Sequence, residues 1–206
     1  MYQTNVVVSS LALYLVTGRR PFLVLACFSL TASVTGKCLK TICRTALRAY
    51  PEVWQRPDGA INCSGYYNES TNVSQTGMPS GHSLGAFAFA TLATLYVLRK
   101  DETDRENAPA SWAYVTWSKI VLLYVAATAV ALSRTTVFGP YSAGGVRVPV
   151  ACHTPAQVAV GATCGVVVAW VFFRYFGDYL FDAHVEALED NNDTQDTQDK
   201  RVRFAV

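Results

Sequence analysis

The feature that most constrains this chain is a set of long apolar runs separated by short polar and charged blocks. A helix needs about 20 apolar residues to cross the hydrocarbon core of a bilayer. Three later runs come close to this length, and two earlier runs are shorter but have neighbouring Ser, Thr and Gly residues that can extend them. The five runs are Val6 to Val16, Pro21 to Val34, Ser80 to Leu98, Trp112 to Leu132 and Thr154 to Phe173. The pattern predicts an all-α, integral-membrane helical bundle with about five transmembrane helices.

The composition agrees with a membrane protein of one domain. Charged residues make up 16% of the 206 residues, whereas a soluble chain has roughly 25%. The formal net charge is +2 and no basic tract is longer than three residues, so nothing indicates a nucleic-acid partner. The first apolar run lacks a basic start and a small-x-small cleavage site, so we interpret it as an uncleaved helix and not as a signal peptide. We predict a membrane-embedded domain over residues 1–177 and a polar, acidic tail over 178–206, with a disordered segment from Glu189 to Lys200.

The polar connections of a chain with five spans fall on two faces of the membrane. The basic stretch 36–56, the loop 57–79 and the connection 133–152 share one face. The charged turn 99–106 and the tail share the other. The loop 57–79 contains three glycosylation sequons, which predict a glycoprotein with this face in the lumen or outside the cell; they begin at Asn62, Asn68 and Asn72. The distribution of Lys and Arg favours the same orientation.

The six cysteines show neither a C-x-x-C pair nor the spacing of a zinc site, so we predict no metal ligands among them. Cys27 and Cys164 lie inside apolar runs, where we expect them to be packing residues. Cys63 and Cys152 lie in connections assigned to the same face. The sequence therefore allows a disulfide between them without requiring it.

Two histidines stand where apolar runs begin. In Pro79-Ser80-Gly81-His82, Ser80 can cap the next helix and Gly81 lets a ligand approach the backbone. The start of that helix offers free N–H groups and a positive dipole end to an anion. In His153-Thr154-Pro155-Ala156-Gln157, Gln157 shares a helix face with His153 and can hold one ring nitrogen, which leaves the other free to attack phosphorus. Because both motifs fall on the face that carries the basic stretch 36–56, we predict phosphate chemistry there.

The two motifs resemble those of the type 2 phosphatidic acid phosphatase (PAP2) superfamily, and His-Thr-x-x-Gln is most similar to its dolichyl diphosphatase branch. The resemblance covers about Gly36 to Trp170. It implies a core like that of the PAP2 and vanadium haloperoxidase proteins. It also implies that His153 is a nucleophile that forms a phosphohistidine, and that His82 protonates the leaving oxygen. Most members have Asp where this chain has Gln157, and a neutral amide stabilises an imidazolium less well than a carboxylate.

The arginine that accompanies the second histidine has two candidates. The superfamily pattern is Ser-Arg, five residues, then His. Ser133-Arg134 supplies the dipeptide, but eighteen residues separate it from His153. Arg147 has the family spacing to His153, but Val146 replaces the serine. We favour Arg147 on spacing and keep Arg134 as the second candidate.

The remaining cationic motif, Lys, six residues, then Arg-Pro, is also irregular. Arg56-Pro57 supplies its end, and Arg48 lies eight positions before Arg56. We favour Lys40 and Arg56 as phosphate ligands, then Arg48 and then Arg44. Each of them could equally be a solvated charge on an amphipathic segment.

The resemblance implies a metal-independent lipid phosphatase without a cofactor, whose partners are the bilayer and a lipid substrate. The expected substrate is a polyprenyl diphosphate such as dolichyl diphosphate, or a related lipid phosphate, hydrolysed on the lumenal side of the endoplasmic reticulum. One alternative is a general lipid phosphate phosphatase that acts on phosphatidate or sphingoid-base phosphate. Another is a catalytically inactive membrane protein that binds lipid phosphates, which the irregular cationic motifs favour and the two intact histidine motifs oppose. A small channel or transporter would leave both histidine motifs unexplained.

Overall fold

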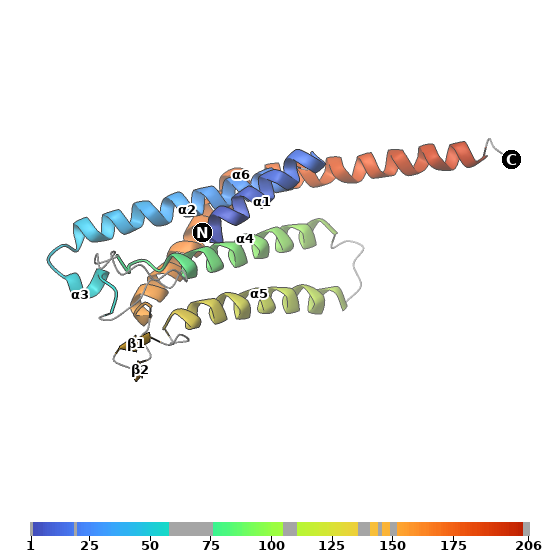
Figure 1. Ribbon diagram of the computed structural model, residues 1–206. Helices are drawn as coiled ribbons and strands as arrows, with labels where there is room; N and C mark the ends of the chain where they lie inside the picture. The colour runs from blue at the N-terminus through green and yellow to red at the C-terminus, as the bar shows by residue number, and fades with distance from the viewer. Residues whose placement is uncertain are drawn as a thin grey trace.

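The computed structural model describes residues 2–18, 20–57, 76–104, 111–135, 141–143, 146–148 and 152–203. These residues form helices and one short β-hairpin (Figure 1). The helices are α1 (Tyr2–Thr17), α2 (Arg20–Ala46), α3 (Pro51–Trp54), α4 (Gly81–Asp104), α5 (Ser111–Thr135) and α6 (Pro155–Arg203). The antiparallel strands are β1 (Tyr141–Ala143) and β2 (Val146–Val148), with Ser142 opposite Arg147.

Four helical segments are long and apolar enough to cross a membrane: Arg20–Ala46, Gly81–Lys100, Ala113–Thr135 and Pro155–Tyr179. The apolar part of α1, Val6–Thr17, is shorter. The prediction of an all-α membrane bundle is confirmed, with four helices of membrane length and α1 as a shorter fifth. The chain is therefore an integral membrane protein.

Successive long helices run in opposite directions, so their ends gather at two ends of the bundle (Figure 1). The turn from α1 into α2 passes through Gly18, whose φ of +66° favours glycine. The Gly18 N–H donates to the carbonyl of Tyr14 over 2.7 Å and closes the last turn of α1. The end of α2, α3, the start of α4, the end of α5, the hairpin and the start of α6 all lie at one end, which we call the site end (Figure 1).

The most extensive helix contact is between α4 and α6, and two glycines of α6 make it possible. A Cβ at Gly161 would lie 2.5 Å from the carbonyl oxygen of Ser80, and a Cβ at Gly165 would overlap the backbone at Leu84. Without side chains at these positions, the two backbones touch.

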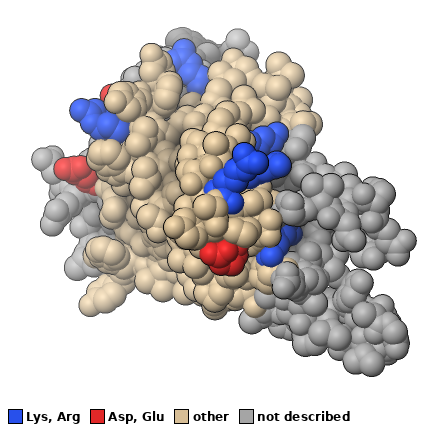
Figure 2. Space-filling view, turned by 90° about the vertical axis from the view of Figure 1, so that its left-hand side faces the viewer, with Lys and Arg blue, Asp and Glu red and all other residues tan. Residues whose placement is uncertain are grey.

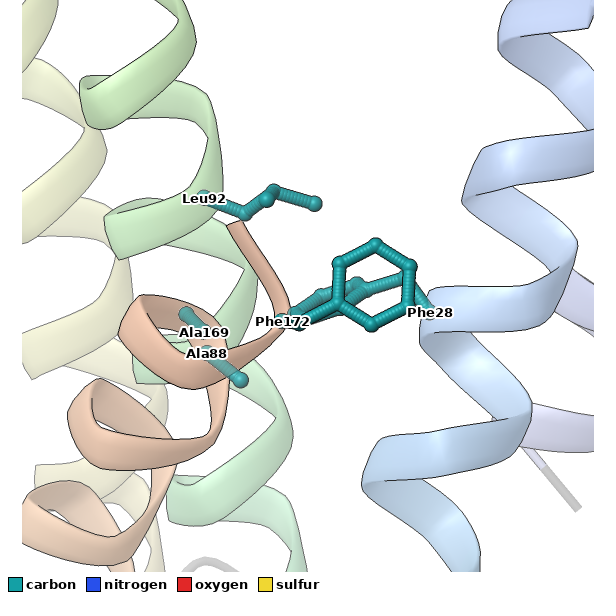
Figure 3. Close-up of a cluster of buried hydrophobic side chains, with 5 residues drawn as sticks. All are labelled: Phe28, Ala88, Leu92, Ala169 and Phe172. Atoms are coloured by element: carbon teal, nitrogen blue, oxygen red, sulfur yellow. The ribbon is translucent and has the colours of Figure 1, made fainter. Parts of the chain in front are cut away.

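The buried core lies farther along the same helices and includes α2 (Figure 3). Phe28 of α2 meets Phe172 of α6 edge to face, with ring centroids 5.0 Å apart. Ala88, Leu92 and Ala169 complete the cluster. Small residues on α4 and α6 bring these helices together, and the two aromatic rings fill the wider space towards α2.

The outer surface of the bundle is rich in large apolar side chains. On α5, Trp117, Val121 and Leu122 are each more than half exposed. Contiguous exposed apolar surface of this kind is unfavourable in water but matches the hydrocarbon of a bilayer. We infer that this face of α5 contacts lipid.

Helix α6 continues beyond the bundle and through the acidic tail to Arg203 (Figure 1). The prediction of a disordered segment from Glu189 to Lys200 therefore differs from the structure. The chain has no glycine or proline between Gly177 and Arg203 that would end a helix, and the composition that suggested disorder does not detect this continuity. At the end opposite the site, Arg99 of α4 and Asp178 of α6 form an exposed ion pair at 2.6 Å.

Candidate active site

The start of α6 is a capping box that also positions a histidine. The Thr154 hydroxyl accepts from the Gln157 N–H over 3.2 Å, and the Gln157 side-chain oxygen accepts from the Thr154 N–H over 3.3 Å. Pro155 stands at the first helical position, which needs no N–H donor. These reciprocal bonds explain why the helix begins here. They also fix the Gln157 side chain beside His153, the residue that precedes Thr154.

His153 is buried, with 2% of its surface exposed, and its ring is oriented by Gln157. The His153 Nδ1 lies 3.3 Å from the Gln157 Oε1. Because an amide oxygen only accepts, Nδ1 carries the proton in this bond, and Nε2 keeps a free lone pair. A neutral imidazole held in this tautomer can act as a nucleophile or a base through Nε2.

The same glutamine ties α6 to the segment that contains α3. The Gln157 Nε2 donates to the carbonyl oxygens of Val53 and Gln55. Its side chain is fully buried, and a Cβ at Gly77 would lie within 2.5 Å of its oxygen. A carboxylate here would point an acceptor at two carbonyl oxygens. Only an amide at this position both accepts from His153 and donates to the carbonyls of the α3 segment.

The first histidine motif is held against the same elements. Gly77 and Met78 both donate their N–H groups to the carbonyl of Trp54, over 2.7 Å and 3.2 Å. The Ser80 N–H donates to the carbonyl of Gln157 over 3.0 Å, and the carbonyl of Ser80 accepts from the Leu84 N–H to open α4. The hydroxyl of Ser80 accepts from that of Ser83 over 3.1 Å. These bonds join the starts of α4 and α6, which carry Gly81 and His82 on one side and His153 on the other.

The end of α5 brings Arg134 to the same place. The carbonyl oxygen of Arg134 accepts from the N–H groups of Cys152 and His153, both over 3.1 Å. The Nε of Arg134 is buried and has no hydrogen-bond partner in the part of the chain that the structure describes. A buried guanidinium N–H of this kind is a ready donor for an anion.

Lys40 and Arg56 complete the cationic surroundings. The ammonium of Lys40 donates to the carbonyl of Thr76 over 3.3 Å, and Thr76 pairs with Gln55 in an isolated antiparallel bridge, next to Arg56. Arg134, Arg56 and Lys40 are among the cations that act electrostatically on His82. The face of the bundle shown in Figure 2 carries Lys and Arg in separate groups, the largest right of centre, and few Asp or Glu side chains on a mostly uncharged surface. This end is built to attract a negative charge.

Burial and these cations set the ionisation of the site groups that lie outside the spans. The pKa of His153 is lowered to about 4, chiefly by burial and then by Arg56, with smaller effects of Lys40 and His82, while its bond to Gln157 acts in the opposite direction. Burial also lowers the pKa of Arg56. Arginine remains charged at neutral pH despite such a shift. At neutral pH the site therefore holds an uncharged His153 beside positive charge.

Most of the residues selected from sequence come together at this end. They are Lys40, Arg56, Ser80, Gly81, His82, Arg134, His153 and Gln157. Arg48 instead lies exposed in the turn after α2. Among the described residues, the charges that shift the ionisation of His82 and His153 do not include Arg48. Arg147 lies in β2, opposite Ser142, and its side chain is outside the described residues.

Some groups that hold the site together were not identified from the sequence. The carbonyls of Val53 and Gln55 carry no sequence signal, because every residue has such a group, whereas the capping box around Thr154 could have been recognised from Thr-x-x-Gln.

Cys152 is disulfide-bonded, and Cys27, Cys38, Cys43 and Cys164 are free thiols. Cys63, which the sequence allows as a partner of Cys152 without requiring it, and the three sequons lie outside the described residues. Within the described ranges, no three His, Cys, Asp or Glu side chains are grouped to hold a metal ion.

The family model of the PAP2 superfamily matches residues 4–180, so the chain belongs to this superfamily. Its members are generally phosphatases that act on lipid phosphates, which supports a hydrolase activity. The matched range extends from α1 to α6 and contains both histidine motifs. Neither a curated protein nor a solved structure matches the chain.

Proposed function

We propose that this member of the PAP2 superfamily is a metal-independent lipid phosphatase that hydrolyses a polyprenyl diphosphate, such as dolichyl diphosphate, or a related lipid phosphate through a phosphohistidine. The observation that carries the proposal is the buried His153, whose Nδ1 is held by Gln157 next to His82 and a group of cations. A nucleophile, an acid and cations for the phosphoryl oxygens are the three parts that such a reaction needs.

In the proposed first step, the free Nε2 of His153 attacks the terminal phosphorus. The P–O bond to the leaving group breaks, and His82 gives a proton to the departing oxygen. The phosphoryl group is then bonded to His153. Gln157 keeps the ring in the reactive tautomer, since its Oε1 accepts from Nδ1. Attack by a neutral imidazole is favoured at neutral pH because the pKa of His153 is about 4.

The developing negative charge is proposed to be balanced by Arg134, Arg56 and Lys40. Arg134 contributes its buried Nε–H, and the start of α4 at Gly81 adds backbone donors. In the second step, water attacks the phosphohistidine, with His82 as the base, and inorganic phosphate leaves. Arg147 retains its place as a candidate on the basis of its spacing to His153 in the chain.

The proposed location is the membrane of the endoplasmic reticulum, with the site on the lumenal side. The support is the set of three sequons in the loop 57–79, which precedes α4 at the site end. Mobility on a gel before and after removal of N-linked glycans tests this orientation. A protein expressed in glycosylating cells whose mobility does not change would contradict a lumenal loop.

Phosphate release in detergent micelles with EDTA present tests the activity. The substrates are dolichyl diphosphate, phosphatidate and sphingosine phosphate, and the proteins are the wild type and His153→Ala. Release from the diphosphate alone, lost in the variant, supports the proposal in full. Release from the monophosphates instead supports a general lipid phosphate phosphatase. No release by a folded protein favours the inactive, lipid-phosphate-binding alternative.

A further inference from the structure

A groove of about 170 Å³ lies between α2 and the start of α4. Its lining includes Ser33, Gly36, Lys37 and Lys40 from α2, and Gly81 and Leu84 from α4. Lys40 and Gly81 belong to the candidate active site, and Gly36 and Ser33 lie about one and two helical turns farther from it along the spanning segment of α2. The groove therefore connects the phosphate-binding end of the bundle to its apolar interior.

Lys37 is a second cation in this groove. It has the spacing of the first phosphate motif to Arg44, but Thr45 follows Arg44 in place of the proline, and Lys37 is not among the phosphate ligands that the sequence favours. Lys37 and Lys40 are three residues apart and share a face of α2. Helix α2 runs towards the site end, so the Cα of Lys37 lies about 4.5 Å farther from that end than the Cα of Lys40. Lys40 acts on both histidines, and Lys37 is not among the charges that act on them. The two lysines thus offer successive positive charges along one path.

We propose that Lys37 binds the lipid-side phosphate of a diphosphate substrate and makes the protein prefer lipid diphosphates to monophosphates. This inference rests on the proposed phosphatase function. When His153 attacks the terminal phosphorus, the bond from that phosphorus to the bridging oxygen breaks. The bridging oxygen stays on the lipid monophosphate and takes a proton from His82. A cation next to that leaving phosphate stabilises the charge that develops on it.

The position of Lys37 suits this role because of the direction in which the lipid must extend. The terminal phosphate lies between the histidines, so the lipid-side phosphate and the hydrocarbon chain extend away from them, along the groove and into the bilayer. In a monophosphate substrate, carbon occupies the place of the second phosphorus. Lys37 then has no anion to contact, and it contributes to the hydrolysis of diphosphates only.

The simpler role for Lys37 is that of an exposed lysine that extends its ammonium to the membrane interface. Lys119 of α5 is a matched control, since it is also exposed and also lies in a spanning segment, but it does not line the groove. Lys37→Gln removes the charge with little change in length, and Lys37→Arg keeps the charge. These variants separate a contact with phosphate from a general effect of a lysine at the membrane surface.

The experiment compares phosphate release from a polyprenyl diphosphate and from the polyprenyl monophosphate of the same chain length, in one detergent. We expect Lys37→Gln to lower the ratio of kcat/KM for the diphosphate to that for the monophosphate about tenfold or more. Lys37→Arg should restore most of the ratio, and Lys119→Gln should leave it within about twofold of the wild type.

An unchanged ratio in Lys37→Gln, or an equal fall in Lys119→Gln, would overturn the inference. Wild-type release from the monophosphate alone would also overturn it, but would leave the phosphatase function standing. If the folded wild type released phosphate from neither of these substrates and from no other lipid phosphate, both the inference and the phosphatase function would be overturned.

Discussion

Helix α4 packs against α6 without a gap but leaves a groove towards α2. In the first contact, Gly161 lets the backbone of α6 touch the backbone of α4 at Ser80. In the second, a Cβ at Gly36 would lie 3.8 Å from the nearest side-chain atom of Leu84, an ordinary contact distance, and a groove of about 170 Å³ remains. The closed contact carries the two histidines. The open one is lined by Lys37 and Lys40, where we propose that the substrate lies.

The closed α4–α6 contact and the open groove between α4 and α2 correspond to two different requirements of a lipid phosphatase. The reacting groups must be held in a fixed geometry, and backbone contact between two helices achieves this because it leaves no side-chain freedom. The lipid must also enter and leave from the bilayer, which requires space between helices. Because α4 contacts α6 on one side and faces the groove on another, the same helix can meet both requirements.

The largest expected effect tests whether the closed contact carries the chemistry. His153→Ala removes the proposed nucleophile and should lower kcat by roughly a thousandfold or more. Phosphate release in micelles measures it, with Lys119→Gln as a control on an exposed surface and a thermal melt to show that the variant folds. A folded His153→Ala protein that keeps a tenth of the wild-type rate would place the chemistry elsewhere.

The next effect distinguishes the two candidate arginines of the site. The carbonyl of Arg134 accepts from the backbone N–H groups of Cys152 and His153, and its Nε–H is buried and unpaired within the described structure. We expect Arg134→Gln to lower kcat/KM roughly a hundredfold, whereas Arg147→Gln lowers it less than about tenfold. The reverse order would mean that spacing along the chain, and not the contact at the end of α5, identifies the phosphate ligand.

A third prediction compares the two helix contacts directly by adding one methyl group to each. Gly161→Ala forces a Cβ against the Ser80 carbonyl and should destabilise the protein by about 1–3 kcal/mol. Gly36→Ala meets only Leu84 at 3.8 Å and should be neutral or slightly stabilising, since alanine favours helix over glycine by about 1 kcal/mol. Thermal melts in one detergent measure both. Equal shifts in Tm for the two variants would contradict the distinction between a closed and an open contact.

The smallest effect concerns pH. The pKa of His153 is about 4 because burial and the cations Arg56 and Lys40 disfavour its charged form. The neutral ring is the nucleophile, so the limb of the pH–rate profile due to His153 should fall as pH decreases through about 4, and not near 6.5 as for an exposed histidine. The rate of phosphohistidine formation from pH 3.5 to 8 measures it.

Gln157→Glu sharpens this pH prediction. A carboxylate next to Nδ1 stabilises the imidazolium, so the acid limb should move to higher pH. The same carboxylate faces the carbonyls of Val53 and Gln55, so the maximal rate should also fall. An acid limb that stays in place in Gln157→Glu would show that the limb does not report on His153.

Several elements of the fold and site could be predicted from local pattern. The apolar runs predict the four long spans, and the two histidine motifs predict which helix starts meet. The β-hairpin at Tyr141–Val148 was not predicted, because its two three-residue strands are too short to give a period. The exposed position of Arg48 was not predicted either, since a basic residue on an amphipathic segment has the same pattern whether it faces a site or the solvent.

The sequence by itself determined the membrane-spanning architecture, the common end of the bundle for both histidines and the pairing of His153 with Gln157. These depend on hydrophobic length and on residues three or four positions apart, which a helix brings together regardless of its surroundings. Only the tertiary structure decided that the carbonyl of Arg134 meets the backbone of His153, that Gln157 donates to the α3 segment and that Lys37 shares a groove with Lys40 and Gly81. Those contacts join residues far apart in the chain, and they depend on how closely each pair of helices packs.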